Sequence, residues 1–420
     1  MERPLVAGWQ CRVCGASVDI AVPFTWQCPN ASATDRHHAL RLVQSTAPLQ
    51  SAGQSNPFLA YRPHLAWDAF AAAHGLTAVA REAMVGELDA LVASAAGTGF
   101  VETPMGRADG LSDALGFGRE GGVWVKDETH NVAGSHKARH LFTILLHLRA
   151  AEQMGLAQWS RRPPLAIASC GNAALAAATL AAAVSWSIQV FVPPFANLQV
   201  TKRLAELGAT VVECPRVPSD PAGDPCVHRF REAVAAGAIP FSVQGPENAW
   251  CLDGGRTLGW ELAKGIGWNR LFVQVGGGAF AASVTEGLRM GGGQPKLHAV
   301  QTQACAPLQR AWTRSRGLSP AEHWSECMWP WENVGESAAD GILDDETYDW
   351  LPVVDSMAST GGSPVVVTEA HVLEANELGC RATGIEASHT GTAGLAGLLA
   401  IRNQVDPDER VAVIFSGIRR

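Results

Sequence analysis

The feature that most constrains the fold is an alternation of two kinds of segment, from about Val123 to the end of the chain. Short runs rich in β-branched residues alternate with longer stretches rich in Ala and Leu. This alternation is typical of parallel sheets covered by helices, so we predict an α/β fold. The predicted strands are 123–125, 165–168, 188–192, 210–212, 271–275, 297–301 and 411–415, and the predicted helices include 137–154, 172–183, 198–207 and 279–289.

Composition excludes several classes of protein. Hydrophobic residues make up 47% of the chain and charged ones 17%, so a large core is expected and global disorder is excluded. The net charge of −8 argues against a nucleic-acid partner. The longest apolar run, Ala-rich from Ala173 to Val184, is too short to span a membrane, and Met1 is not followed by the apolar segment of a secretory signal. We therefore expect a cytoplasmic protein with reduced cysteines.

The chain also divides by composition. Residues 1–45 carry three cysteines and little periodicity, and residues 44–57, rich in Ser, Gln and Pro, are interpreted as a linker. We expect a zinc-ribbon-like extension at 1–45, a large domain formed by 46–135 and 236–420, and a small mobile domain at 136–235.

In parallel sheets, ligands bind where strands end and loops turn into helices. The first such loop ends at Lys137, in the first turn of a predicted helix. The positive end of the helix dipole disfavours a cation there, so a lysine fits best if its amine is neutral, as in a Schiff base. The alternative is a solvated surface lysine.

Three more loops follow predicted strands. Ser169, Cys170, Gly171 and Asn172 open an Ala-rich helix, where backbone amides could bind a carboxylate or where Ser169 or Asn172 could cap the helix. Gly276, Gly277, Gly278 and Ala279 leave backbone amides bare for a phosphate, although three glycines could also form only a tight turn. Ser416 follows the last predicted strand and could face a ligand or serve only as a turn residue.

The order of these loops resembles the fold-type II pyridoxal-phosphate (PLP) enzymes, which include threonine synthase, threonine and serine dehydratases, cysteine synthase and the tryptophan synthase β subunit. The resemblance runs from about Glu102 to Gly417. The matching segments are Thr103-Pro104, Lys126-Asp127-Glu128, Gly134-Ser135-His136-Lys137, Ser169-Cys170-Gly171-Asn172-Ala173-Ala174, Val275-Gly276-Gly277-Gly278, Asp340-Gly341-Ile342, Glu386-Ala387-Ser388 and Ser416-Gly417.

The resemblance implies a fold with two lobes of parallel-rich sheet, and it implies a role for each loop. Lys137 would hold PLP as a Schiff base and move the α-proton of the substrate. The amides of residues 276–279 would hold the cofactor phosphate, Asn172 would contact the 3′-oxygen, and Ser416 would face the pyridine nitrogen. The substrate carboxylate would bind at Ser135, Ser169, Cys170 and Gly171.

A neutral serine at the pyridine nitrogen favours elimination or replacement over transamination, so we expect a PLP-dependent lyase or synthase. Within the family the chain is most similar to threonine synthase, including a cysteine-bearing N-terminal extension. Where threonine synthases tend to read Asn-Pro-Tyr-Arg-x-Glu-Gly-Gln-Lys-Thr, this chain has Cys251 at the arginine. Two kinds of substrate thus stay open. A threonine synthase would act on phosphohomoserine, and an ammonia-lyase would act on threonine, serine or a related amino acid.

The N-terminal cysteines form one Cys-x-x-Cys pair, Cys11 and Cys14, with Cys28 further on. A structural zinc site has four ligands, and His37, His38 or Asp35 could supply the fourth. The alternative is a ribbon that keeps its shape without metal.

Two functions of other classes remain. One is a nucleotide-dependent enzyme that uses the glycines at 276–278. The end of the next strand lacks the acidic residue that such an enzyme would need, and this argues against it. The other is a catalytically silent amino-acid-binding relative, against which counts the intact Lys137. We expect a small-molecule amino-acid substrate, a homodimer, and neither nucleic acid nor membrane as partner.

Overall fold

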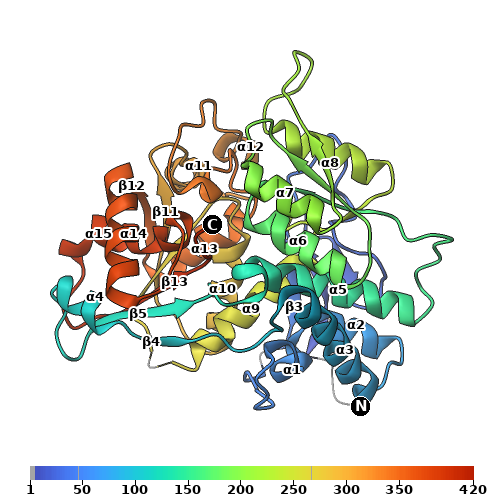
Figure 1. Cartoon of the computed structure of the whole chain (residues 1–420), viewed down its shortest axis with the longest axis horizontal. Coiled ribbons are helices and arrows are strands. Elements are labelled where there is room, and N and C mark those ends of the chain that lie inside the picture. The colour runs from blue at the N-terminus through green and yellow to red at the C-terminus, as the bar shows by residue number, and fades with distance from the viewer. Residues whose placement is uncertain (1–4, 46, 266) are drawn as a thin grey trace. The chain divides into compact units, whose positions relative to one another are not determined.

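The computed structural model describes residues 5–45, 47–265 and 267–420, and the chain forms two compact units (Figure 1). Unit 1 contains the described residues up to Glu102, Asn131–Ala133 and Lys137–Thr257, and unit 2 contains Thr103–His130, Gly134–His136 and Leu258–Arg420. Residues 47–102 thus group with 137–257, whereas the sequence-based division placed them with 236–420. That division, into a ribbon, a large cofactor-binding domain and a small mobile domain, stays a prediction.

Unit 1 begins with a three-stranded antiparallel sheet in the order β2-β1-β3. Its strands are β1 (Val6–Cys11), β2 (Ser17–Asp19) and β3 (Leu40–Gln44). At Gly8 a Cβ would overlap the backbone of Val18 on the paired strand, which explains a glycine inside β1. Pro57 then opens the first helix, and no strand or helix is assigned to 47–56, the stretch interpreted as a linker.

The second sheet of unit 1 is parallel, in the order β8-β7-β6-β9; β6, β7 and β8 were predicted from the sequence, and the two-residue β9 was not. The helix α6 packs against α5 and α3, and Ala, the best helix former, fills most of its length. The strands are β6 (Leu165–Ala168), β7 (Ile188–Val192), β8 (Thr210–Glu213) and β9 (Ile239–Pro240); the helices are α1 (Pro57–Ala60), η1 (Arg62–His64), α2 (Ala66–Ala73), α3 (Ala78–Ala96), α5 (Lys137–Gln153), α6 (Asn172–Ala183), α7 (Leu198–Glu206) and α8 (Pro225–Ala235).

Unit 2 contains a six-stranded sheet in the order β12-β11-β10-β13-β5-β4, in which only β4 runs antiparallel to its neighbour. Its central strands are buried on both faces, as their continuous apolar runs indicate. The helix α15 packs on β10, β11 and β13, and α14 packs on α15 (Figure 1). The strands are β4 (Met105–Arg107), β5 (Gly122–Asp127), β10 (Arg270–Gln274), β11 (Lys296–Thr302), β12 (Ser363–Val367) and β13 (Arg410–Phe415).

The remaining helices belong mainly to unit 2, and α9 includes residues of both units. They are η2 (Val132–Gly134), α4 (Asp109–Ala114), α9 (Trp250–Ala263), α10 (Ala279–Met290), α11 (Pro307–Arg314), α12 (Trp324–Cys327), η3 (Asp340–Ile342), α13 (Trp350–Thr360), α14 (Glu369–Thr383), α15 (His389–Ala400) and η4 (Arg402–Gln404). Across the residues described, no helix is both long and apolar enough to cross a membrane.

Candidate active site

Lys137 is the first residue of α5, as predicted, and its side chain is half-buried. The chain reaches it through a tight turn in which Ala133 and Gly134 both have positive φ values, 54° and 70°. A Cβ on Gly134 would lie 2.7 Å from Cγ2 of Ile418, so this turn needs a glycine for both reasons. The turn therefore fixes the first residue of α5 and with it the position of the Lys137 side chain.

The two residues before Lys137 contact the segment Ser416–Gly417, far along the chain. His136 donates from its backbone N–H to the carbonyl oxygen of Ser416 at 3.1 Å, and its ring Nδ1 lies 3.0 Å from the same oxygen. Because a carbonyl oxygen only accepts, Nδ1 carries the hydrogen. The imidazole also stacks on Phe280, with ring centroids 3.9 Å apart. The residue before the lysine is thus locked to the residue that the resemblance places at the pyridine nitrogen.

Ser135 is fully buried, and within the described chain its hydroxyl has no hydrogen-bond partner. A buried hydroxyl without a partner costs free energy of about 1–3 kcal/mol. An acceptor supplied by a bound molecule would remove that cost. Ser135 therefore suits the predicted role as a substrate-binding residue.

One turn further along α5, His140 reports on the electrostatics near the lysine. Burial, together with the nearby charge of Lys137, lowers the pKa of His140 to about 3. Its Nδ1 lies 2.8 Å from the carbonyl oxygen of Cys251, so the neutral ring donates there. His140 is therefore a neutral hydrogen-bond donor one turn along α5 from Lys137.

The loop after β6 leads directly into α6. The Ser169 hydroxyl accepts from the backbone N–H of Gly171 at 3.3 Å, and α6 begins at Asn172 with Gly171 at its N-cap. Gly171 stands at the N-cap and has no side chain with which to cap the helix. The amides of a helix N-terminus are a ready site for an anion. Cys170 is exposed, and Ser169, Gly171 and Asn172 are half-buried.

The glycine loop, residues 276–278, joins β10 to α10 as predicted. Gly278 has φ 94°, and a Cβ there would lie 2.9 Å from Cγ2 of Thr347. A Cβ on Gly276 would overlap the carboxylate of Asp344. Gly278 is the N-cap of α10 and has no side chain, so the loop brings backbone amides to a helix N-terminus. The same geometry places the Asp344 carboxyl group beside the predicted phosphate site.

Ser416 directly follows β13 and is 3% exposed. Its Oγ lies 2.6 Å from Nε2 of Gln274, at the end of the neighbouring strand β10. The next residue, Gly417, forms a bridge with Ser135 and accepts from the backbone N–H of Ser388 at 3.0 Å. Residues that lie far apart in the sequence, Ser135, Ser388 and Gly417, thus meet at the end of β13.

Comparison with known proteins identifies the family. A family model described as "Pyridoxal-phosphate dependent enzyme" matches residues 97–417, about three quarters of the chain. The chain belongs to this family. Threonine synthases of Methanocaldococcus jannaschii and Methanosarcina acetivorans are 23% and 24% identical to it over 329 and 333 residues, which in both cases are 75% of this chain and 74% of the relative.

Several solved structures share the fold. The processed form of threonine deaminase isoform 2 from Solanum lycopersicum is 18% identical with a TM-score of 0.59, covering 82% of this chain and 91% of that one. Maize serine racemase is 16% identical with a TM-score of 0.60, covering 80% and 92%. An L-serine ammonia-lyase from Rhizomucor miehei is 18% identical with a TM-score of 0.57, covering 76% and 94%. The predictions of a fold-type II chain and of a PLP-dependent enzyme of lyase or synthase type are confirmed.

The residues of this chain fit the cofactor of the family. The glycine loop and the start of α10 offer amides for a phosphate, Ser416 offers a neutral hydroxyl, and Ser135 is a buried hydroxyl with a bond still to make. Two carboxylic acid residues, Asp344 and Asp349, lie beside the loop. The roles of the single residues remain predictions.

Two sets of site residues escaped the sequence analysis. One is Gln274, a polar residue in a strand of buried residues, which is the signal that could have revealed it. The other is the buried ion pair of Lys126 with Glu261, in which Nζ of Lys126 lies 2.6 Å from the Glu261 carboxylate. The same Nζ donates to the carbonyl oxygen of Thr103. The Thr103 hydroxyl in turn donates to Glu128 at 2.5 Å. This fully buried network fixes the strand end that leads toward Lys137, and breaking one partner would leave a buried charge.

The N-terminal cysteines gather with one histidine. The ligand atoms of Cys11, Cys14, Cys28 and His38 all lie within 4.8 Å of one another, so the structure selects His38 from the three predicted candidates. His38 faces Cys11 with Nδ1 at 3.4 Å, and its Nε2 lies 3.4 Å from the carboxylate of Asp35. Burial raises the pKa of Cys11, but hydrogen bonds from the backbone of Cys14 and from His38 lower it to about 6. Burial raises the pKa of Cys28 to about 12.

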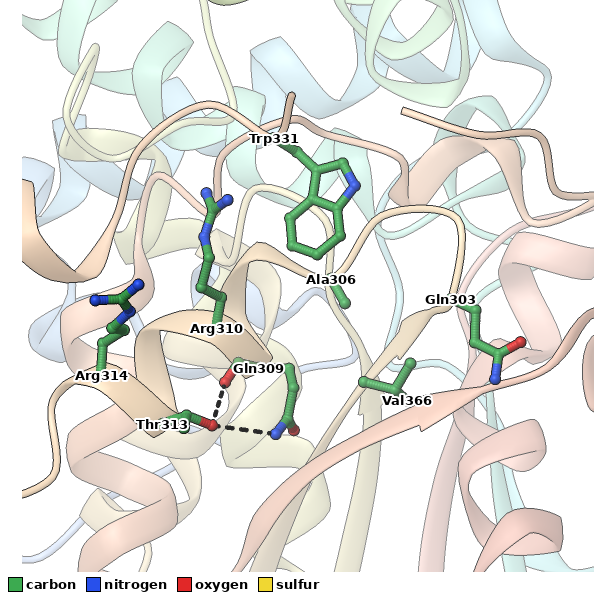
Figure 2. A pocket seen from close by; sticks show the side chains of 8 residues that line it. All are labelled: Gln303, Ala306, Gln309, Arg310, Thr313, Arg314, Trp331 and Val366. Carbon is green, nitrogen blue, oxygen red and sulfur yellow. Dashed lines mark hydrogen bonds between the residues drawn. The ribbon is translucent and has the colours of Figure 1, made fainter. Parts of the chain in front are cut away.

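A surface pocket of unit 2 is lined by two arginines, Arg310 and Arg314 (Figure 2). The guanidinium group of Arg310 lies 3.7 Å from the ring centre of Trp329 and pairs with Glu332 at 3.1 Å. Glu332 offsets the charge of Arg310, and Arg314 adds a second guanidinium group to the lining. The residues that line the pocket are Gln303, Ala306, Gln309, Arg310, Thr313, Arg314, Trp331 and Val366.

Proposed function

We propose that the enzyme eliminates or replaces a group at the β- or γ-carbon of an amino acid, with PLP held by Lys137 as a Schiff base. The observation that carries this proposal is the neutral Ser416, anchored through its carbonyl oxygen to His136, the residue before the lysine. PLP, when bound, supplies an electron sink for the bond that breaks at the α-carbon. A hydroxyl at the ring nitrogen weakens that sink, which suits reactions in which a leaving group departs with the electrons.

Each predicted residue has a task in this reaction. The amides of the glycine loop and of Ala279 bind the phosphate, and Asn172 orients the ring through its 3′-oxygen. The amides at the start of α6 and the Ser169 loop, including Cys170 and Gly171, bind the substrate carboxylate, and Ser135 adds a hydrogen bond. Lys137 removes the α-proton and later returns one.

A second candidate, an ammonia-lyase acting on threonine or serine, is favoured by the segment 248–257. A threonine synthase acting on phosphohomoserine needs a cation for the substrate phosphate. Cys251 is fully buried, and Arg256 is buried in an ion pair with Asp253 and donates to Gln44 at 2.7 Å. Neither residue offers a spare positive charge, so an unphosphorylated hydroxy amino acid fits this segment better.

The test is a substrate screen with the purified, coloured enzyme. Serine and threonine are assayed for release of a 2-oxo acid and ammonia, and phosphohomoserine for release of phosphate and formation of threonine. Turnover of serine or threonine supports the ammonia-lyase, and turnover of phosphohomoserine supports the synthase. An enzyme that binds PLP but converts amino acids only to 2-oxo acid and the pyridoxamine form of the cofactor contradicts the proposal.

We also propose that Cys11, Cys14, Cys28 and His38 hold one structural zinc ion. Three sulfurs and an imidazole are a common zinc ligand set, and Asp35 orients the histidine as outer-shell carboxylates do. Metal analysis is expected to find about one zinc per chain, lost in Cys14→Ser and retained in Cys380→Ser, a cysteine of unit 2. A fully folded and active preparation without metal favours the metal-free ribbon. We further propose that the enzyme is cytoplasmic and forms a homodimer. Sedimentation measurements test the homodimer.

A further inference from the structure

Gln274 is the last residue of β10 and lies in the interior of unit 2. All five residues of the strand are buried, and Gln274 is 3% exposed. Its Nε2 lies 2.6 Å from Oγ of Ser416, 3.0 Å from the carbonyl oxygen of Gly391 and 3.2 Å from that of Ile414. A polar side chain in such a place is stable only where its hydrogen bonds are made.

The surroundings decide which end of the amide faces Ser416. Carbonyl oxygens only accept hydrogen bonds, so the group that faces Gly391 and Ile414 must be the NH₂ group. The amide oxygen points the other way, and across the described residues it has no hydrogen-bond partner. A Cβ on Gly394 would lie 3.0 Å from that oxygen, so the glycine leaves room for it. The reverse orientation would bring three oxygens together.

The orientation of Gln274 in turn sets the direction of the Ser416 hydroxyl. The NH₂ group shares its two hydrogens among three acceptors, and because it cannot accept, its shortest contact, 2.6 Å to Oγ, makes Ser416 the acceptor. The single hydrogen of the hydroxyl is then left to donate elsewhere. We propose that Gln274 is a positioning residue that fixes Ser416 as a hydrogen-bond donor toward the ring nitrogen of the cofactor. This inference rests on the proposed function, because it requires PLP with its ring nitrogen at Ser416.

The consequence concerns the protonation of the ring. A fixed donor matches a ring nitrogen that keeps its lone pair. A protonated nitrogen would require the hydroxyl to accept a second hydrogen bond and to turn its hydrogen toward carbonyl oxygens that Gln274 already contacts. Gln274 therefore acts against protonation of the ring and so against transamination. This also explains a glutamine with an unpartnered amide oxygen, among the described residues, where an apolar residue would be more stable.

The test uses Gln274→Met, which keeps the length of the side chain and removes the NH₂ group, with Gln274→Leu as a second variant. The readout is the ¹⁵N signal of PLP labelled at the ring nitrogen and bound to the enzyme. Without the amide, the hydroxyl can donate to the carbonyl oxygens of Gly391 or Ile414 and accept from the ring. We expect the signal to move toward the position of a protonated pyridine, and the ratio of transamination to elimination to rise about tenfold, the change that one pKa unit gives.

Ser416→Ala provides the matched control. If Gln274 acts through the hydroxyl, adding Gln274→Met to Ser416→Ala changes neither the ¹⁵N signal nor the ratio any further. Unchanged signals in both Gln274 variants with PLP still bound overturn this inference and leave the proposed function intact. A wild-type protein that binds no PLP overturns both. An equal effect of Gln274→Met with and without the hydroxyl shows a merely structural role and also overturns the inference.

Discussion

Placing a carboxylate in the glycine loop tests the phosphate assignment most sharply, and Gly277→Asp is the substitution of choice. Gly277 is the loop position where a side chain fits best, because its nearest neighbour, Cδ2 of Tyr348, would lie 3.2 Å from a new Cβ and its φ is not in the left-handed region. A carboxylate there would repel a phosphate held by the loop amides. At an effective dielectric constant of about 20 and an assumed separation of ~5 Å, one pair of unit charges costs roughly 3 kcal/mol.

We therefore expect Gly277→Asp to weaken PLP binding about a hundredfold relative to Gly277→Asn, which has the same shape and no charge. The assay is a spectroscopic titration of cofactor-free enzyme with PLP at fixed ionic strength, and the difference should shrink as salt is added. Thermal unfolding without PLP checks that both variants keep the fold. Equal PLP affinity in the Asp and Asn variants would refute the assignment of the phosphate to this loop.

Three further predictions concern charge and protonation. Ser416→Asp should raise transamination relative to elimination while lowering the main activity, and an unchanged product ratio would speak against Ser416 at the ring nitrogen. Asp344→Asn should tighten PLP binding several-fold by removing a charge beside the loop, and unchanged or weaker affinity in the titration above would count against a phosphate there. His147 is fully buried against Trp250, and burial lowers its pKa to about 3, so below pH ~6.5 only the unfolded state takes up this proton. His147 should thus contribute about 2 kcal/mol to the loss of stability between pH 7 and pH 5, and His147→Phe should remove that share in urea unfolding; parallel pH profiles for the two proteins would contradict it.

Strands whose sequence is a bounded apolar run could be predicted to the residue, and β6 and β7 have the expected bounds. The strand β12 was missed because Pro364 and the preceding Gly361 and Gly362 argue against a strand. The structure places β12 at the edge of the sheet, where a proline is tolerated. Local pattern thus predicts the central strands, while an edge strand is decided by its place in the sheet.

The loops of the site could be found from the sequence because each follows a strand. Their supporting contacts could not, since they join residues far apart in the chain. Gln274 and Ser416 are 142 residues apart, and Lys126 and Glu261 form an ion pair between different elements. The fourth member of the cysteine cluster shows the same limit, because only the fold brings His38 to the sulfurs.

The central claim, that Lys137 carries PLP, is tested most directly by reduction of the coloured enzyme with borohydride, followed by digestion and peptide mapping. Reduction turns a Schiff base into a stable amine on the lysine that formed it. We expect loss of the visible absorption band and the cofactor mass on the peptide that contains Lys137, with no such label in Lys137→Ala. Label on another lysine, or a protein that stays colourless after incubation with PLP, would contradict the account.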